Sequence, residues 1–316
     1  SGVGMLDKAF IDCGFEVVAA IEIDPHAAET YRYNIGPEII VEDIRNVDKH
    51  ALPKVPLIIA GSPCQGFSPE NRVTNHPENE NNLLIYEHIK TVQANEACEV
   101  FVLENVRGVL TSGDEKYLNA IRTELPQFKI TTGVLNAADF GTPQNRHRAF
   151  IIGCRHGKIQ LPQKLEHAYK TVREAFKGLT NKIANQLDFT MPKQETLERI
   201  KLVGAGQNFS SLPKELRTKG SHSNNYKRLE YDKPSITIAN VRKANILHPD
   251  PDVHRTLSVR ECARLMDLPD DFEFKGTLSA KQQQVANGVP LNLGKAIARQ
   301  VRKAFMTYGV GLISRL

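Results

Sequence analysis

The stretch SGVGMLDKAFIDCGFEVVAAIEIDPHAAETYRY, residues 1–33, decides the fold. It opens with a glycine turn, Gly2-Val3-Gly4, and then alternates two kinds of pattern. Apolar residues at helical spacing cover residues 5–13 and 25–33, and an apolar run over residues 16–23 separates them. Alternating helices and strands are typical of βαβ units, in which parallel strands share a sheet that helices cover. The stretch therefore predicts an α/β fold.

The same alternation continues outward from this stretch. The further apolar runs are residues 38–41, 57–60 and 100–103, and a further helical pattern covers residues 83–96. Two later runs, 129–135 and 149–154, are close enough in sequence to form a hairpin-like pair. We expect a doubly wound, mostly parallel sheet with helices on both faces.

The character of the chain changes near Thr171. Residues 171–250 carry many polar side chains and prolines and show few clean periods, which indicates a smaller and irregular domain. Helical patterns return at residues 258–266 and 291–305. We expect a catalytic and ligand-binding domain at 1–170, an irregular domain at 171–260, and a return to the first domain at 261–316.

Composition excludes several classes of protein. No apolar run approaches the ~20 residues that a membrane helix needs, and no secretory signal is visible, so a cytoplasmic protein is expected. The five cysteines are scattered without a CxxC pair, and the histidines are not spaced as ligands, so neither disulfides nor a metal is expected. Basic residues outnumber acidic ones by 41 to 36, and the net charge of +5 permits a polyanionic partner. We interpret the basic stretch 295–303 as a solvated helix face rather than a nucleic-acid contact.

Residues at the carboxyl ends of the expected strands indicate a nucleoside ligand. Glu22 follows the glycine turn by 20 residues, which is the spacing of a ribose-binding acid. The third glycine of a dinucleotide motif is absent, since Asp7 stands there, and this disfavours a pyrophosphate-containing cofactor. An ordinary tight turn is the alternative interpretation of the two glycines.

A second group of residues indicates covalent chemistry. Cys64 lies in a loop rich in proline and glycine after an apolar run, and Glu104 ends the neighbouring run. A thiolate beside a carboxylic acid suits addition to an electron-poor heterocycle, provided that burial keeps the acid protonated. The alternative is that Cys64 is a small buried apolar residue.

The motifs of this chain, in order, resemble those of the DNA cytosine-5 methyltransferases of the bacterial and phage restriction-modification type. The resemblance covers nearly the whole chain and rests on these segments: SGVG (1–4), AIEID (20–24), EDI (42–44), GSPCQGFS (61–68), LIYE (84–87), ENV (104–106), QNRHR (144–148), RTLSVRECARL (255–265) and ANGVP (286–290). Met5, Ile23 and Ala286 depart from the residues common in that family, which bears on cofactor affinity more than on chemistry.

The resemblance implies a catalytic role for four residues. Cys64 would add to C6 of a cytosine flipped out of the duplex, and Glu104 would donate a proton to N3. Arg146 and Arg148 would orient the base and support the nucleophile loop. The methyl donor would be S-adenosylmethionine, with S-adenosylhomocysteine as product and no metal.

It also implies contacts with the cofactor and with double-stranded DNA, the latter through Gln65 and Ser68, and a target-recognition domain at 171–260. In that domain the donors of Arg242 suit phosphates or base edges, so we expect it to contact DNA, and a solvated polar loop is the alternative. A monomer associated with the nucleoid is expected. The residues expected to contact the cofactor are Gly2, Gly4, Glu22, Ile23, Asp43, Ile44, Pro63, Leu84, Asn287, Val289 and Leu316.

The two ends of the sequence suggest a circular permutation. The last residues, LISRL, joined to SGVGM at the start resemble the uninterrupted beginning of the family's first motif. We expect residues 310–316 to supply the first strand of the sheet, with Leu316 beside the cofactor. A tail with an accidental similarity is the alternative.

Three other functions remain open on the sequence. A tRNA cytosine-5 methyltransferase shares most of these motifs, although the Cys-Phe-Thr element of that branch is absent here. A regulatory DNA-binding module could keep the fold without activity, but Cys64 and Glu104 are both intact. An NAD-dependent oxidoreductase is disfavoured by the glycine pattern.

Overall fold

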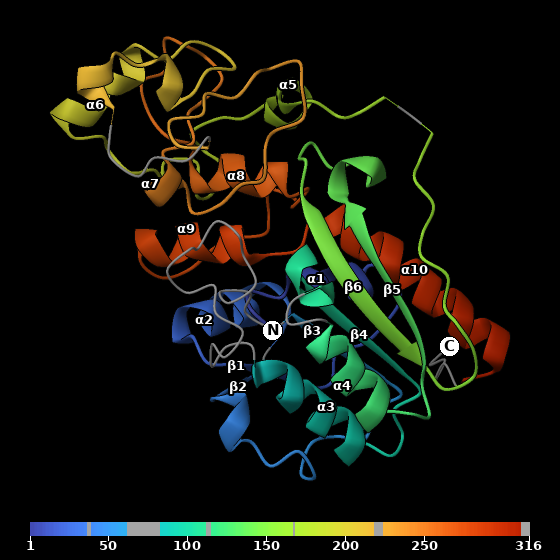
Figure 1. The fold of residues 1–316 in the computed structure, drawn as a ribbon. Coiled ribbons are helices and arrows are strands. Elements are labelled where there is room, and N and C mark those ends of the chain that lie inside the picture. The colour runs from blue at the N-terminus through green and yellow to red at the C-terminus, as the bar shows by residue number, and fades with distance from the viewer. Residues whose placement is uncertain (37–38, 62–82, 112–114, 167, 218–223, 311–316) are drawn as a thin grey trace.

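The computed structural model describes residues 1–316 except 37–38, 62–82, 112–114, 167, 218–223 and 311–316 (Figure 1). Its strands are β1 (Ala20–Glu22), β2 (Ile39–Val41), β3 (Leu57–Gly61), β4 (Val100–Asn105), β5 (Lys129–Asn136) and β6 (His147–Cys154). Its α-helices are α1 (Met5–Ile11), α2 (Pro25–Asn34), α3 (Leu84–Ala94), α4 (Lys116–Glu124), α5 (Val172–Phe176), α6 (Gln194–Lys201), α7 (Val241–Ala244), α8 (Val259–Leu265), α9 (Leu278–Asn287) and α10 (Leu291–Tyr308). Short 3₁₀ turns cover Ile44–Asn46, Arg107–Leu110, Ala137–Phe140, Phe209–Ser211 and Lys214–Leu216.

The described strands form a parallel pair and a mixed four-stranded sheet, rather than the one mostly parallel sheet expected. β1 pairs with β2 in parallel, and a second group has the order β3-β4-β6-β5. β3 and β4 are parallel, whereas β6 runs antiparallel to both β4 and β5. The connection between β5 and β6 is too short for a crossover helix, so these two strands must be antiparallel. The hairpin-like pair expected from the sequence is thus confirmed.

Alternate residues of β4 explain how helices cover both faces of the sheet. Val100 and Val102 face the cluster formed by α1 and α10, whereas Phe101 and Leu103 face the one formed by α3 and α4. All four side chains are fully buried, as expected for a strand between two helical layers. Figure 1 shows this central sheet with β4, β6 and β5 in succession and the pair β1–β2 on the β3 side.

The irregular domain lies above the sheet in Figure 1, with α6 and α7 in it and α8 below. It has a small core of its own, which includes Ile200, Tyr226 and Leu247. The expected helix at 258–266 is observed as α8, where Ser258 and Glu261 form a capping box. The domain boundaries at 171 and 260 stay predictions.

The expected first strand falls mostly outside the described residues, because 311–316 are not among them. Val310, its one described member, is not in a strand; its N–H bonds to the Phe305 carbonyl at the end of α10. At the other end, the Ser1 amino group donates to the Ile21 carbonyl of β1, 2.8 Å away. The strand at 310–316 and the position of Leu316 therefore remain predictions.

Candidate active site

Glu104 is the centre of the candidate site. It is the penultimate residue of β4, it is 7% exposed, and its register partner on β3 is Gly61. A Cβ atom on Gly61 would lie 3.2 Å from Glu104 Oε2, so the glycine leaves room for the carboxyl group. Burial raises the pKa of Glu104, although the positive charges of Arg148 and Arg146 act against this. Glu104 is therefore easier to protonate than an exposed glutamate, as a proton donor must be.

Arg148 holds the Glu104 carboxyl in place. Its Nε lies 2.9 Å from Glu104 Oε1, and its side chain is 12% exposed. It comes from β6, the neighbour of β4, and a second donor, Nη1, bonds to the His147 carbonyl. The ion pair fixes the carboxyl on one side and leaves Oε2 facing Gly61.

Arg146 occupies a different position from Arg148. It is 1% exposed, and its guanidinium donates to the carbonyls of Ile238, Ala286 and Gly288 at 3.0, 2.6 and 2.9 Å. These carbonyls belong to segments more than 90 residues away along the chain. The side chain therefore connects the irregular domain, at Ile238, to the ANGVP segment, and its expected contact with a base stays a prediction.

Gln144 and Asn145 hold a distant segment in place, a role that the sequence did not predict. Gln144 is fully buried, accepts from the Ile238 N–H and donates to the Leu265 carbonyl, both at 3.0 Å. The Asn145 N–H donates to the Ser235 carbonyl. Segment 144–146 thus fixes residues 235–238 against the sheet. The only sequence signal for this part was the position of Gln144 and Asn145 directly before Arg146 in the QNRHR segment.

The glycine turn and Glu22 come together as expected. The Gly2 N–H donates to Glu22 Oε2 at 2.7 Å, and the Asp24 N–H to Oε1 at 3.0 Å. Burial acts to raise the pKa of Glu22, but the Ser1 ammonium and these N–H donors outweigh it, so the pKa is lowered. Glu22 is therefore an ionised acceptor. Gly4 needs to be glycine, since its φ is +82° and a Cβ would lie 2.5 Å from an Ile35 carbon.

The other described residues expected to contact the cofactor lie on several elements. Ile23 is 62% exposed beside Glu22, and the ion pair with Arg45 lowers the pKa of Asp43 after β2. Met5 packs against Gly288, which brings residues 286–290 beside the glycine turn. There Asn287 is exposed and Val289 is buried; Ile44 starts a 3₁₀ turn, and Leu84 starts α3.

Several predicted site residues cannot be placed. Cys64, Pro63, Gln65 and Ser68 lie outside the described residues, between Gly61 and Leu83. Arg242 lies in α7, and its side chain is outside the description. The roles of these residues stay predictions.

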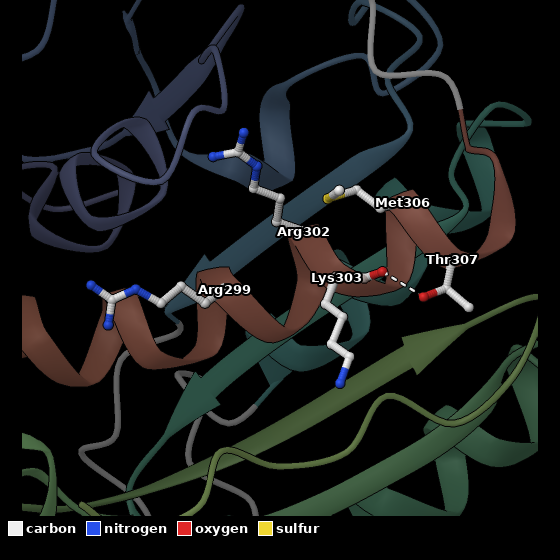
Figure 2. Close-up of a pocket in the computed structure, with 5 residues that line it drawn as sticks. All are labelled: Arg299, Arg302, Lys303, Met306 and Thr307. Carbon is white, nitrogen blue, oxygen red and sulfur yellow. Dashed lines mark hydrogen bonds between the residues drawn. The ribbon is translucent and has the colours of Figure 1, made fainter.

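The basic stretch 295–303 lies on α10, as Figure 2 shows. Arg299, Arg302 and Lys303 are exposed, and with Met306 and Thr307 they line a hollow of about 380 Å³. Arg302 also donates to the Cys13 carbonyl. None of the predicted site residues lines this hollow. The exposure expected for this helix face is observed, and the expected absence of a nucleic-acid contact stays a prediction.

Within the ranges that the structure covers, no three His, Cys, Asp or Glu side chains are grouped as metal ligands. In the same part of the chain, no helix combines the length and apolar character needed to cross a membrane.

Comparison with known proteins gives a consistent result. Residues 1–303 match the family described as C-5 cytosine-specific DNA methylase. The chain is 32% identical to the Type II methyltransferase M1.HphI of Haemophilus parahaemolyticus, over 96% of this chain and 85% of that protein. It is also 32% identical to the Type II methyltransferase M.NgoFVII of Neisseria gonorrhoeae, over 92% and 81% of the two chains.

Solved structures share the fold. A putative DNA modification methyltransferase encoded within an E. coli prophage superposes with a TM-score of 0.77 at 22% identity, over 96% of this chain and 97% of that chain. The Dnmt2 methyltransferase of S. pombe superposes with a TM-score of 0.70 at 16% identity, over 98% and 97%. Given the family match over residues 1–303 and the two relatives, this chain belongs to the C-5 cytosine-specific DNA methylase family and is a DNA cytosine-5 methyltransferase.

Proposed function

We propose that the chain transfers a methyl group from S-adenosylmethionine to C5 of a flipped cytosine in a specific duplex sequence, through a covalent bond between Cys64 and C6. The observation that carries the proposal is the buried Glu104 carboxyl with its raised pKa, held by Arg148 where the loop bearing Cys64 begins. Flipping is required because C5 and C6 are inaccessible in stacked duplex DNA.

The residues divide the reaction between a nucleophile and an acid. The Cys64 thiolate forms a bond to C6 while Glu104 gives its proton to N3, so negative charge does not accumulate on the ring. C5 becomes electron-rich and takes the methyl group. A base, such as water, then removes the C5 proton, the C5–C6 double bond reforms, and the Cys64 thiolate leaves as the N3 proton returns to Glu104. Arg148 keeps the carboxyl aimed throughout.

The residues near the glycine turn fit S-adenosylmethionine, which supplies an electrophilic methyl group when bound. Glu22 is an ionised acceptor suited to ribose hydroxyls, and the exposed Ile23 offers an apolar surface to adenine. We assign Gly2, Gly4, Asp43, Ile44, Leu84, Asn287 and Val289 to the same ligand, together with Pro63 and Leu316.

The relatives named Type II methyltransferases support a place in a restriction-modification system. We assign Gln65, Ser68 and Arg242 to DNA contacts, and we expect a monomer that acts on DNA at the nucleoid.

The test is bisulfite sequencing of mixed-sequence duplex DNA after incubation with S-adenosylmethionine. The unaltered chain should protect cytosines in one fixed context, and Cys64→Ser should protect none. Glu104→Gln should slow methylation by roughly 10²–10⁴-fold, the usual contribution of a general acid, while still binding S-adenosylhomocysteine. A duplex with 5-fluorocytosine at the mapped site should then trap the Cys64 adduct. Full activity in Cys64→Ser would refute the mechanism.

A further inference from the structure

Two separate sets of hydrogen bonds connect residues 286–288 to residues 238–240 of the irregular domain. The first is Arg146, whose guanidinium bonds the carbonyls of Ala286, Gly288 and Ile238. The second is a chain of side-chain amides. Asn240 Nδ2 donates to Gln283 Oε1 at 2.8 Å, and Gln283 Nε2 donates to Asn287 Oδ1 at 2.7 Å. Gln283 and Asn287 are one turn apart on α9, so they share a face of that helix.

The direction of this chain determines what Asn287 presents to a ligand. A carboxamide has one accepting oxygen and one donating nitrogen. Because the Asn287 oxygen accepts from Gln283, its Nδ2 group is the part left for another partner, and no described side chain or carbonyl accepts from it. Asn240, at the other end of this series of amides, is 9% exposed, so the surrounding residues restrict its side chain.

We propose that Gln283 is a positioning residue that turns the Asn287 amide nitrogen towards the cofactor and couples cofactor binding to the DNA-recognition segment 235–240. The inference rests on the proposed function, because it takes Asn287 as a cofactor contact. Any shift of Asn240 on DNA binding changes the hydrogen bond to Gln283 and, through it, the orientation of Asn287. Coupling of this kind is reciprocal, so the cofactor should also strengthen DNA binding.

Titration calorimetry with S-adenosylhomocysteine tests the proposal, with and without a duplex that carries the methylated site. In the unaltered enzyme, DNA should tighten binding of S-adenosylhomocysteine. Gln283→Ala should weaken that binding by about two- to tenfold, the effect of one hydrogen bond, and should reduce the gain that DNA gives. Gln283→Glu should weaken it more, because its carboxylate still accepts from Asn240 but repels the Asn287 oxygen and turns the amide over.

Gln282→Ala is the matched control. Gln282 is the adjacent residue of α9 and bonds Thr190, so its loss removes a side-chain contact of the same kind without reaching Asn287. It should lower the melting temperature and leave cofactor affinity and its DNA dependence unchanged.

Three outcomes overturn the proposal. If both Gln283 variants bind as the unaltered enzyme does, Gln283 has no positioning role. If Gln282→Ala has the same effect as Gln283→Ala, the effect is general loss of stability. If the unaltered enzyme binds no S-adenosylhomocysteine at all, the proposed function fails and the inference with it.

Discussion

The Nε atom of Arg148 lies 2.9 Å from Oε1 of Glu104, and both side chains are nearly buried between β4 and β6. Two opposing effects act on the carboxyl at this position. Burial favours the neutral acid, and the guanidinium favours the carboxylate. Burial is the larger effect, so the pKa of Glu104 stays raised while its orientation is fixed.

This balance predicts the pH profile of Arg148→Met. Loss of the guanidinium removes the charge that lowers the pKa of Glu104, so the pKa rises further. The acid form is the active one, and activity is lost as pH rises through this pKa. The alkaline limb of kcat should therefore move to higher pH, while the maximal rate falls roughly 10- to 100-fold because the carboxyl is no longer aimed.

Initial rates of methyl transfer as a function of pH measure this limb. Arg173→Met removes an exposed ion pair with Asp232 and serves as the control with an unchanged profile. A limb that moves to lower pH in Arg148→Met would contradict the assignment of Glu104 as the acid.

Asp267 should limit stability at neutral pH. Burial raises its pKa to about 6, despite the ion pair with Lys170, and its φ of 60° is one that asparagine also adopts readily. Below the unfolded-state pKa the carboxyl is protonated in both states, and its burial does not lower the free energy of unfolding through ionisation. As pH rises to about 6, the folded state must ionise the buried group, and the free energy of unfolding falls. Asp267→Asn should therefore stabilise the protein at pH 7.5 by about 1–3 kcal/mol.

Urea unfolding at pH 4, 5, 6 and 7.5 gives the measurement. The difference between Asp267→Asn and the unaltered chain should grow between pH 4 and 6 and then level off. Asp252→Asn, on an exposed turn, should show no such trend. A difference that is constant with pH would show that Asp267 is not the titrating group.

The predicted strand at 310–316 can be tested by truncation after Val310. If these residues pair with the sheet beside the glycine turn, their removal should lower Tm by roughly 5–10 °C and weaken binding of S-adenosylhomocysteine. A truncated chain with the same Tm and the same affinity would favour the accidental tail. Ser314→Ala, which keeps the backbone, is the control.

Local patterns were sufficient to predict the elements that carry the candidate site. The apolar run that ends at Leu103 and the polar Glu104 after it predicted both β4 and the acid at its carboxyl end, and the helical pattern over residues 258–266 predicted α8. These features depend on neighbouring residues only. The antiparallel insertion of β6 between β4 and β5 depends instead on strand pairing across the chain, so only the β5–β6 pair was foreseen.

The positions of the buried arginines could not be predicted in the same way. Arg146, Arg228 and Arg260 are each at most 1% exposed, and each donates to two or more backbone carbonyls from distant segments. Which carbonyls lack a partner depends on how irregular segments cross one another, and no sequence period records it. The resemblance implies a contact between Arg146 and the base, which stays a prediction, and it gives no sign of the bonds from this guanidinium to the carbonyls of Ile238, Ala286 and Gly288.

Arg228 should be the most sensitive residue of the irregular domain. Its guanidinium bonds the carbonyls of residues at the end of α6 and in the loop before α8: Ile200, Val203, His248, Asp250 and Val253. The side chain is fully buried, and burial lowers its pKa. Arg228→Met fills a similar volume but leaves these carbonyls without a donor, at an expected cost of roughly 3–5 kcal/mol.

The effect should be local, because these carbonyls belong to the irregular domain and not to the glycine turn. Arg228→Met should lose sequence-specific DNA binding in a mobility-shift assay while it retains binding of S-adenosylhomocysteine. Lys227→Met is the control, since its side chain makes one bond, to the Gly206 carbonyl, at the edge of the same domain. Equal loss of cofactor binding and DNA binding in Arg228→Met would mean that the two domains unfold together. An unchanged mobility shift would mean that the hydrogen bonds of Arg228 do not hold the DNA-binding surface in place.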